Sequence, residues 1–339
     1  MRIKDVAVKA GVSTATVSHV INETKFVTDK TRRRVQQAIE ELGYYPNAHA
    51  RSLASGRTNI IGLLISDISN PFFPELVKSI ETAAFERGYN VMLFNTNYDA
   101  ERAADYVRRL IGLKVAGVAL MTAELEPSLI EELRLRRVNA VFNDLGTVDE
   151  KMSNIILDYS SGIEEAVRHL VSLGHERIAH IAGSDRILSG NIRRDSFVAS
   201  MRKYLPDADP GLIVPGDFRF ESGRMAASEI LRMSELPTAA VAANDLMALG
   251  AMAQLKEAGL RIPEDISIIG FDDIAFAALS DPPLTTVCSP RTEIGRRAVE
   301  ALMLTIERKE QSGVEIRIPT HLIVRRSTAP PQNLRREAA

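Results

Sequence analysis

Polar side chains follow several long apolar runs of this chain, at the point where each run ends. The runs IIGLLIS (60–66), GVALM (117–121) and ISIIGFD (266–272) are continuously apolar, which is typical of strands covered on both faces of a parallel sheet. In open parallel sheets, ligands bind beyond the carboxyl ends of the strands. The residues at these ends are mostly acids and amides: Asp67, Asn95, Thr122, Asp144, Ser184, Asn244, Asp245 and Asp272. We therefore expect a polar binding site there.

Aromatic side chains lie near the same strand ends. Phe72 and Phe73 follow the first run in the loop NPFF, and Phe218 follows the short predicted strand LIVPGD. Carboxylates and amides bind hydroxyl groups, and aromatic faces cover the apolar side of a ring, so the combination predicts a pocket of the kind that holds sugars. A second interpretation stays open at each Asx residue, because an Asx side chain at a strand end can simply cap the following helix.

Motifs for enzyme chemistry are missing from the sequence. It contains neither common form of the glycine-rich phosphate loop, and no nucleophile elbow. His175 and Glu176 resemble a zinc helix, but His180 comes five residues after His175 rather than four, in a stretch with the pattern of a strand. Cys288 has no CxxC partner and is interpreted as a core or lobe-crossing residue. We expect no catalytic residue, no metal, no cofactor and no enzymatic activity.

The apolar runs alternate with helical patterns in two series. The first series has runs at 60–66, 90–95, 117–121 and 139–143. The second has runs at 177–183, 238–244 and 266–272, with helices near 159–173, 190–203, 221–232 and 245–258. A helix at 292–309 and short strands around 316–324 follow. This order predicts an α/β core of two lobes, each with a doubly wound parallel sheet.

Length and composition agree with a folded, multidomain chain. The 339 residues, of which 45% are hydrophobic, suffice for two or three compact domains. A single cysteine excludes an internal disulfide framework, and the start MRIKDV lacks the apolar segment of a signal peptide. No apolar run reaches the roughly 18 residues that span a bilayer. We therefore expect a cytoplasmic protein without a membrane partner.

A helical head precedes the core. In Ile3–Asn22, IKDVAVKAGVSTATVSHVIN, apolar residues recur at helical spacing on both sides of Gly11, which predicts two helices joined by a tight turn. Ser13 is placed to cap the second helix. A third helix is expected to be capped by Thr28 and to end at Gly43. Together the three helices can bury a small core.

Charge separates this head from the rest of the chain. Residues 1–57 hold ten Lys and Arg against five Asp and Glu, a local charge of +5, whereas the whole chain has a net charge of −2. Such a split is typical of a nucleic-acid-binding head on an acidic protein. A plain surface helix hairpin is the alternative, and the charge and the third helix argue against it.

These features resemble the lac repressor and purine repressor family (LacI/GalR), with a head most similar to the purine repressor type. The resemblance is close over Ile3–Ser55, including VSTATVSHVIN, TRRRVQQAIEELGYYPN and ARSLASG, and continues more loosely to about Thr328. It implies an N-terminal all-α helix-turn-helix head with a hinge helix, followed by a bilobed core similar to periplasmic binding proteins. The implied domains are 1–45 for the head, 46–57 for the hinge, 58–328 for effector binding and dimerisation, and 329–339 for a disordered tail.

The resemblance implies roles in DNA binding. The second helix lies in the major groove, and the hinge helix folds in the minor groove, where Leu53 matches an intercalating leucine. Ala54 departs from the purine-type pattern, which has a lysine there. Lys4, Lys30 and Arg32 supply phosphate contacts. The expected DNA-binding residues are Thr14, Ala15, Thr16, Ser18, His19, Asn22, Lys25, Ala50 and Leu53.

The resemblance also implies an effector site between the lobes. The matching positions are Phe72, Phe73, Asp144, Ser189, Arg193, Phe218, Asn244 and Asp272. Ile187 stands where the purine-responsive pattern has an arginine that faces the base, which argues against a purine. Because Arg193 can bind vicinal hydroxyls or a carboxylate, a sugar or sugar acid is favoured.

The expected function is that of a homodimeric transcriptional repressor. Two heads bind a pseudo-palindromic operator, and a small polar effector between the lobes controls operator affinity. Lobe one is expected to comprise about 58–158 and 289–318, and lobe two about 159–288 and 319–328. No long apolar heptad run follows residue 328, so a tetramer is not expected. The alternatives are a nucleobase- or nucleoside-responsive repressor, a solute-binding protein for transport, and a Rossmann-type enzyme.

Overall fold

The computed structural model describes residues 2–22, 25–45, 58–122, 124–145, 148–209, 212–307 and 312–331. The chain divides into two compact units, 1–59 and 60–339, and each is described by itself. The predicted hinge helix at 46–57 lies outside the described residues.

The N-terminal unit is a bundle of short helices. They are α1 (Ile3–Ala10), α2 (Thr14–Asn22) and α3 (Asp29–Leu42). Val6, Val17 and Val35 are fully buried in their shared core. Gly11 and Gly43, with φ of 61° and 56°, adopt the left-handed conformation that ends α1 and α3. The predicted helix-turn-helix is thereby confirmed.

The caps of α2 and α3 differ. The Ser13 hydroxyl accepts a 3.1 Å hydrogen bond from the Thr16 amide, so the predicted cap of α2 is confirmed. Thr28 occupies the equivalent position before α3, but its hydroxyl bonds the Thr31 hydroxyl at 3.0 Å rather than a backbone amide. The predicted Thr28 side-chain cap is therefore wrong, because a neighbouring threonine competes for the same hydroxyl.

Lobe one is built on a sheet with the strand order β11-β5-β4-β3-β1-β2, in which every neighbouring pair is parallel. Its elements are β1 (Ile60–Ile65), α5 (Phe72–Phe85), β2 (Asn90–Asn95), α6 (Ala100–Gly112), β3 (Gly117–Met121), α7 (Pro127–Leu135), β4 (Ala140–Asn143), β5 (Met152–Asp158), α13 (Arg291–Glu307) and β11 (Glu315–Pro319). Residues of α5 and α13 pack on one face of the sheet, and residues of α6 and α7 on the other.

Lobe two repeats this design with the strand order β12-β10-β9-β8-β6-β7, parallel except for the pair β10–β12. Its elements are α8 (Tyr159–Ser172), β6 (Ile178–Ile181), α9 (Leu188–Tyr204), β7 (Ile213–Val214), α10 (Phe220–Ile230), β8 (Ala239–Ala242), α11 (Asp245–Glu257), β9 (Ser267–Asp272), α12 (Ala275–Leu279), β10 (Thr285–Cys288) and β12 (His321–Ile323). Helices α8 and α9 cover one face, and α10 and α11 the other.

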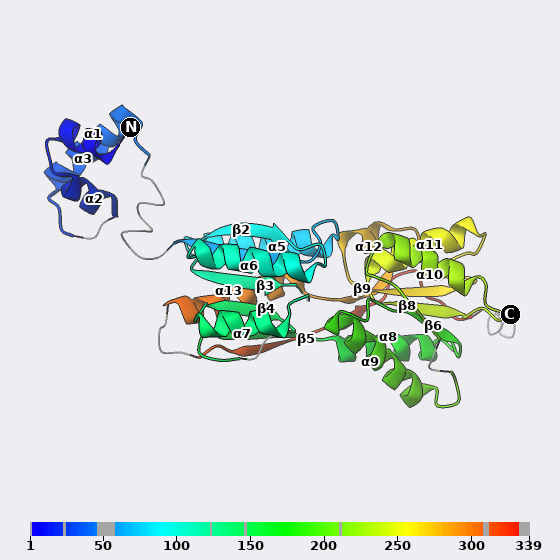
Figure 1. The fold of residues 1–339 in the computed structure, drawn as a ribbon. Helices are drawn as coiled ribbons and strands as arrows, with labels where there is room; N and C mark the ends of the chain where they lie inside the picture. Colours follow the sequence, from blue (N-terminus) through cyan, green and yellow to red (C-terminus); the bar gives the residue numbers. More distant parts are fainter. Residues whose placement is uncertain are drawn as a thin grey trace. The chain divides into compact units, whose positions relative to one another are not determined.

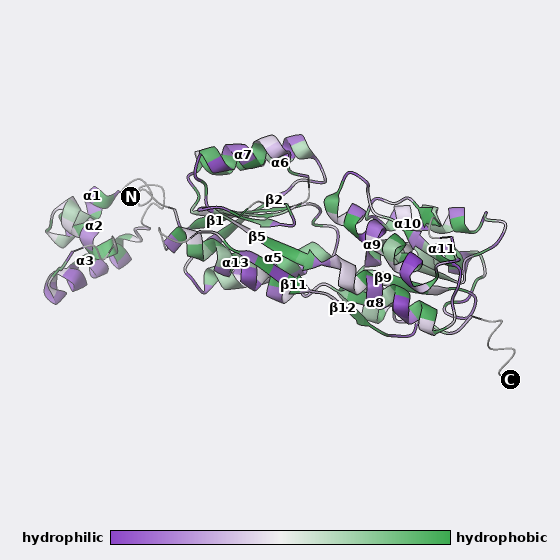
Figure 2. Cartoon of the chain, turned by 90° about the horizontal axis from the view of Figure 1, so that it is seen from below, coloured by the Kyte–Doolittle hydropathy of each residue, from purple (hydrophilic) through white to green (hydrophobic). Residues whose placement is uncertain are grey.

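The chain passes repeatedly between the lobes. It crosses from β5 to α8, from β10 to α13 and from β11 to β12, and the two lobes lie side by side (Figure 1). The helices that cover the sheets carry both hydrophilic and hydrophobic residues (Figure 2), because one face of each helix packs on a sheet. The predicted fold class, a helix-turn-helix head with a bilobed α/β core, is confirmed.

The structure also corrects the expected tail. Ala329 was assigned to a disordered segment, but its N–H donates to the Ser267 hydroxyl at 3.1 Å, and its carbonyl oxygen lies 2.9 Å from His175 Nε2. Pro331 is buried. The segment is ordered here because buried polar groups of lobe two bind its backbone. Residues 332–339 lie outside the described part.

Candidate functional site

A cavity lies at the carboxyl ends of the strands of both lobes. Seven of the eight predicted effector residues line it: Phe72, Phe73, Ser189, Arg193, Phe218, Asn244 and Asp272. The other lining residues are Ser66, Asn70, Leu76, Tyr98, Met121, Thr122, Asn143, Tyr159 and Ile187. Of the eight residues that the strand-end rule selected, Thr122, Asn244 and Asp272 line this cavity, together with residues from distant parts of the chain.

Arg193 lies on α9 at the centre of the cavity and is only 7% exposed. Its guanidinium carbon lies 4.1 Å from the ring centroid of Phe271 and 4.7 Å from that of Tyr159. One guanidinium nitrogen donates to the carbonyl of Ala243, and Nε has no hydrogen-bond partner among the described residues. The rings thus fix the guanidinium, and a buried donor is left for an acceptor in the cavity.

Asp272 ends β9 opposite Arg193, with its Oδ1 3.6 Å from a guanidinium nitrogen. The residue is 5% exposed, and burial raises the pKa of its carboxyl to about 6, opposed by the charges of Arg193 and Arg291. Its φ of 111° is unusual for a residue with a side chain. Because Asp272 lines the cavity, its carboxylate can accept hydrogen bonds from a ligand there.

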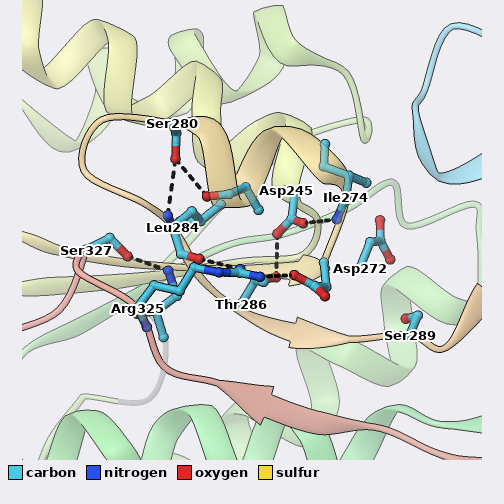
Figure 3. Close-up of polar contacts among 12 residues, drawn as sticks. Asp245, Asp272, Ile274, Ser280, Leu284, Thr286, Ser289, Arg325 and Ser327 are labelled. Atoms are coloured by element: carbon cyan, nitrogen blue, oxygen red, sulfur yellow. Dashed lines mark hydrogen bonds and ion pairs between the residues drawn. The ribbon is translucent and has the colours of Figure 1, made fainter.

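Asp245, the next acid in this region, has a structural role. Its carboxylate accepts hydrogen bonds from the amide of Ile274 at 2.8 Å and from the hydroxyl of Thr286, as Figure 3 shows. It is completely buried, and burial raises its pKa well above the ordinary value, with a further contribution from Asp272. This carboxyl therefore holds the turn after β9 in place.

Asn244 both caps the following helix and lies at the cavity, the two roles that a strand-end Asx residue can have. Its side-chain oxygen accepts from the Met247 amide at 2.9 Å and so caps α11, while its Nδ2 donates to the carbonyl of Phe218 at 2.9 Å. The side chain nevertheless lines the cavity. Asn244 thus fixes the position of the Phe218 ring as well as the start of the helix.

Asp144 is the predicted effector residue that does not line the cavity. Its carboxylate accepts from the Tyr159 hydroxyl at 2.6 Å, the Asn143 side chain at 2.7 Å and the Leu157 amide at 3.0 Å. Burial raises the pKa of this carboxyl. Asp144 does not line the cavity, whereas its partners Tyr159 and Asn143 do, so a direct contact between Asp144 and an effector stays a prediction.

The aromatic residues enclose the cavity. Phe72 and Phe73 pack edge to face, with ring centroids 5.3 Å apart, at the start of α5. Phe218 is 7% exposed and has a φ of 70°. Sequence reasoning missed Tyr98 and Tyr159. Tyr159 follows β5, a strand that was not predicted from the sequence. Tyr98 lies just beyond Asn95, where a strand end is expected, so the strand-end rule could have found it.

In the head, six of the nine residues expected to bind DNA lie on α2, from Thr14 to Asn22. Thr14 and Ala15 are exposed, and Thr16, Ser18 and His19 are partly exposed, while Val17 is buried. Lys25 is exposed between α2 and α3. The Asn22 side chain, Ala50 and Leu53 lie outside the described residues. The exposed side of α2 therefore carries short polar and apolar side chains, the kind that contact base edges.

Arg34 has a role that sequence reasoning missed. Its guanidinium, on α3, donates to the carbonyl oxygens of Ala10 and Gly11 at the end of α1. A cation at a helix C-terminus stabilises the unpaired carbonyls there. This arginine therefore joins α3 to the turn of the helix-turn-helix.

The two histidines whose spacing resembles a zinc helix, His175 and His180, form hydrogen bonds within lobe two. His175 bonds the Thr238 hydroxyl at 2.8 Å, and His180 lies on β6, where Nδ1 bonds the Val241 carbonyl at 2.8 Å. Within the described ranges, no group of three or more His, Cys, Asp or Glu side chains is arranged to hold a metal ion. Among the helices of the described residues, none is long and apolar enough to cross a membrane.

Comparisons with known proteins cover both units. Residues 2–47 match the family described as bacterial regulatory proteins, lacI family, and residues 167–328 match a periplasmic binding protein-like domain. The HTH-type transcriptional repressor PurR of Vibrio atlanticus (strain LGP32) is 39% identical over 309 residues, 91% of this chain and 92% of that protein.

Two solved structures are also similar over nearly the whole chain. The lac repressor dimer bound to operator and the anti-inducer ONPF has a TM-score of 0.86 at 30% identity, over 97% of this chain and 99% of that one. The complex of the transcriptional regulator CelR with cellobiose has a TM-score of 0.71 at 33% identity, over 96% and 99%.

Proposed function

This chain belongs to the lacI family of bacterial regulatory proteins and is a DNA-binding transcriptional repressor, and from that premise we propose that a sugar or sugar acid bound between its lobes controls its operator affinity. The active form is a homodimer, with one head on each half-site of a pseudo-palindromic operator. The similar lac repressor structure is a dimer on its operator, which supports this assembly.

The pair formed by Arg193 and Asp272 carries the proposal for the effector. Both side chains are buried, they face each other at 3.6 Å, and the arginine keeps an unused donor. Vicinal hydroxyls satisfy both, because a hydroxyl donates to the carboxylate and accepts from the guanidinium. The rings of Phe72 and Phe218 cover the apolar face of a pyranose or furanose.

DNA is read by α2. Thr14, Ala15 and His19 contact base edges in the major groove, and Lys4, Lys25, Lys30 and Arg32 contact phosphates. The exposure of Thr14 and Ala15, together with the +5 charge of residues 1–57, supports this assignment. Leu53 and Ala50 are assigned to the minor groove from the family resemblance.

A nucleobase or nucleoside is the second candidate effector. The similarity to proteins named PurR favours it, as does the aromatic lining of the cavity. Ile187, which is 6% exposed and lines the cavity, offers only an apolar contact to a base. This side chain is the reason for placing sugars first.

A binding screen tests the proposal. The full chain is heated with D-ribose, D-glucose, D-galacturonate, hypoxanthine and inosine, and the unfolding temperature is measured. We expect a sugar or sugar acid to raise this temperature in the native protein and not in Arg193→Ala. A rise with hypoxanthine alone would favour the second candidate. A rise that persists in Arg193→Ala would place the site elsewhere.

A further inference from the structure

A second cavity, named the outer cavity because it lies beyond Tyr98 and Ile187 from the effector residues, also opens at the carboxyl ends of the strands. Its charged lining includes Glu124 of lobe one and Arg186 and Arg219 of lobe two. Only two of its lining residues, Tyr98 and Ile187, also line the effector cavity. These two side chains, one from each lobe, therefore border both cavities.

The loop that carries Tyr98 is held firmly to lobe one. Asn97 and Tyr98 follow β2 with φ of 57° and 60°, in the left-handed region that side chains rarely adopt. The amides of Thr96 and Asn97 donate to the carbonyls of Ile65 and Ser66 at 2.9 and 2.7 Å. Two such conformations in succession persist only where surrounding contacts impose them, so the loop has a defined course.

The Tyr98 ring reaches across to lobe two. It packs against the hydrophobic cluster that contains Ile187 and Phe218. The Arg219 guanidinium lies over the ring, 5.4 Å from its centroid. Burial raises the pKa of the phenol, so the ring stays uncharged at neutral pH. Swinging the ring aside would break its contacts with this cluster and with Arg219 together.

We propose that Tyr98 determines effector specificity by size, because with Ile187 it closes the inner cavity and so admits one ring and excludes a second. This inference rests on the proposed function, since it takes the inner cavity as the effector site. Excluding the wrong ligand by a steric wall is a common source of specificity, and truncation of the wall removes it. The outer cavity then receives the second ring only when Tyr98 is shortened.

Matched pairs of small molecules test this size limit. D-glucose is compared with cellobiose, one pyranose against two, and hypoxanthine with inosine, the fused base alone against the base with a ribose, so each pair sets one ring system against two. Affinities are measured by calorimetry for the native chain, Tyr98→Ala and Tyr98→Phe, which keeps the ring. We expect Tyr98→Ala to raise the two-ring to one-ring affinity ratio of the binding pair by about tenfold or more, and Tyr98→Phe to leave the ratio as in the native chain. An unchanged ratio in Tyr98→Ala would overturn the proposal.

A thiol-labelling experiment tests the wall without any effector. Ser66 lines the inner cavity and is 2% exposed, so Ser66→Cys in a Cys288→Ser background places a single thiol in that cavity. Labelling by methyl methanethiosulfonate is compared with labelling by a bulky aromatic maleimide. We expect Tyr98→Ala to raise the relative rate of the bulky reagent by about tenfold or more, since the removed ring is the steric barrier. Equal relative rates in both proteins would contradict the wall.

The two experiments separate the two proposals. If Tyr98→Ala raises the relative labelling rate of the bulky reagent but no variant binds a sugar or nucleobase, the size limit is supported and the proposed effector class is contradicted. Binding of a one-ring molecule that Arg193→Ala abolishes, with an unchanged size ratio in Tyr98→Ala, supports the effector site and overturns the role of Tyr98.

Discussion

Glu75 of lobe one and Arg291, at the start of α13, form an ion pair of 2.8 Å. The same guanidinium donates to the backbone carbonyls of Asp272 and Asp273, in the turn after β9. Arg291 is largely buried, with 11% of its side chain exposed. The pair therefore connects this turn, whose Asp272 lines the candidate cavity, to α5, whose first residues, Phe72 and Phe73, line the same cavity.

Breaking this ion pair should weaken the coupling between effector and operator more than effector binding itself. In Glu75→Gln, Asp272 keeps its position opposite Arg193, but the turn is no longer tied to lobe one by a charge. We expect the effector-induced change in operator affinity to shrink by about 0.5–2 kcal/mol, the usual range for residues on a coupling route. Operator titrations with and without effector measure it.

Glu293 offers a matched control for that variant. It lies on α13, is 43% exposed like Glu75, and is paired with Arg296 and Arg297 on the surface. Glu293→Gln should leave the coupling unchanged. Equal losses in both variants would show that the Glu75–Arg291 pair has no special part in transmission.

Effector affinity should depend on pH through Asp272. Its pKa is raised to about 6 by burial, and only the ionised carboxylate accepts two ligand hydroxyls, so a proton competes with the effector. The affinity is expected to be constant above pH about 7 and to fall by up to about tenfold per unit below 6. Calorimetry between pH 5 and 8 checks this, and Asp272→Asn should bind weakly with no such slope. A flat profile in the native protein would exclude Asp272 as an acceptor.

Variants of the head should distinguish residues that read bases from residues that contact phosphates. His19→Ala should reduce discrimination between operator and random DNA by about 1–3 kcal/mol while random binding stays constant. Lys25→Ala should weaken both and lower the slope of log K against log salt by about 1. Fluorescence anisotropy at several salt concentrations measures both. If His19→Ala lowered both affinities equally, the histidine would be a phosphate contact.

The Ser13 cap should stabilise the head. Its hydroxyl accepts from the Thr16 amide, and Ser13→Ala is expected to cost about 1 kcal/mol. Hydrogen exchange of the Thr16 amide in the full chain should accelerate correspondingly, whereas Ser13→Asp, which can still cap, should retain protection. Equal exchange in the native chain and Ser13→Ala would mean that the cap contributes nothing.

Continuous apolar runs made most of the fold predictable. IIGLLI, GVALM and SIIGFD form β1, β3 and β9 because buried parallel strands need apolar residues on both faces. β5 was missed, since it is parallel to β4 but no helix separates the two strands in the sequence. β10 was missed because its sequence TTVC has only one strongly apolar residue, and its partners come from β9 and the distant β12.

The candidate site was predictable to the extent that strand ends determine it. Arg193 and Asp272 face each other because α9 and β9 both reach the same edge of lobe two. That Asn143 and Tyr159 line the cavity while Asp144 does not could not be foreseen from the sequence. This arrangement depends on the left-handed φ of 62° at Asp144 and on the unpredicted strand β5, which precedes Tyr159. The same holds for Tyr98, whose position follows from two successive left-handed residues.

Operator titration of the full chain with and without the sugar found by the screen tests the central claim most directly. The native protein should change its operator affinity by about tenfold or more when the sugar is added, within the usual range of allosteric coupling. Arg193→Ala should bind operator as tightly as the native protein without sugar and show no change with it. An undiminished sugar response in both Arg193→Ala and Asp272→Asn would contradict the account.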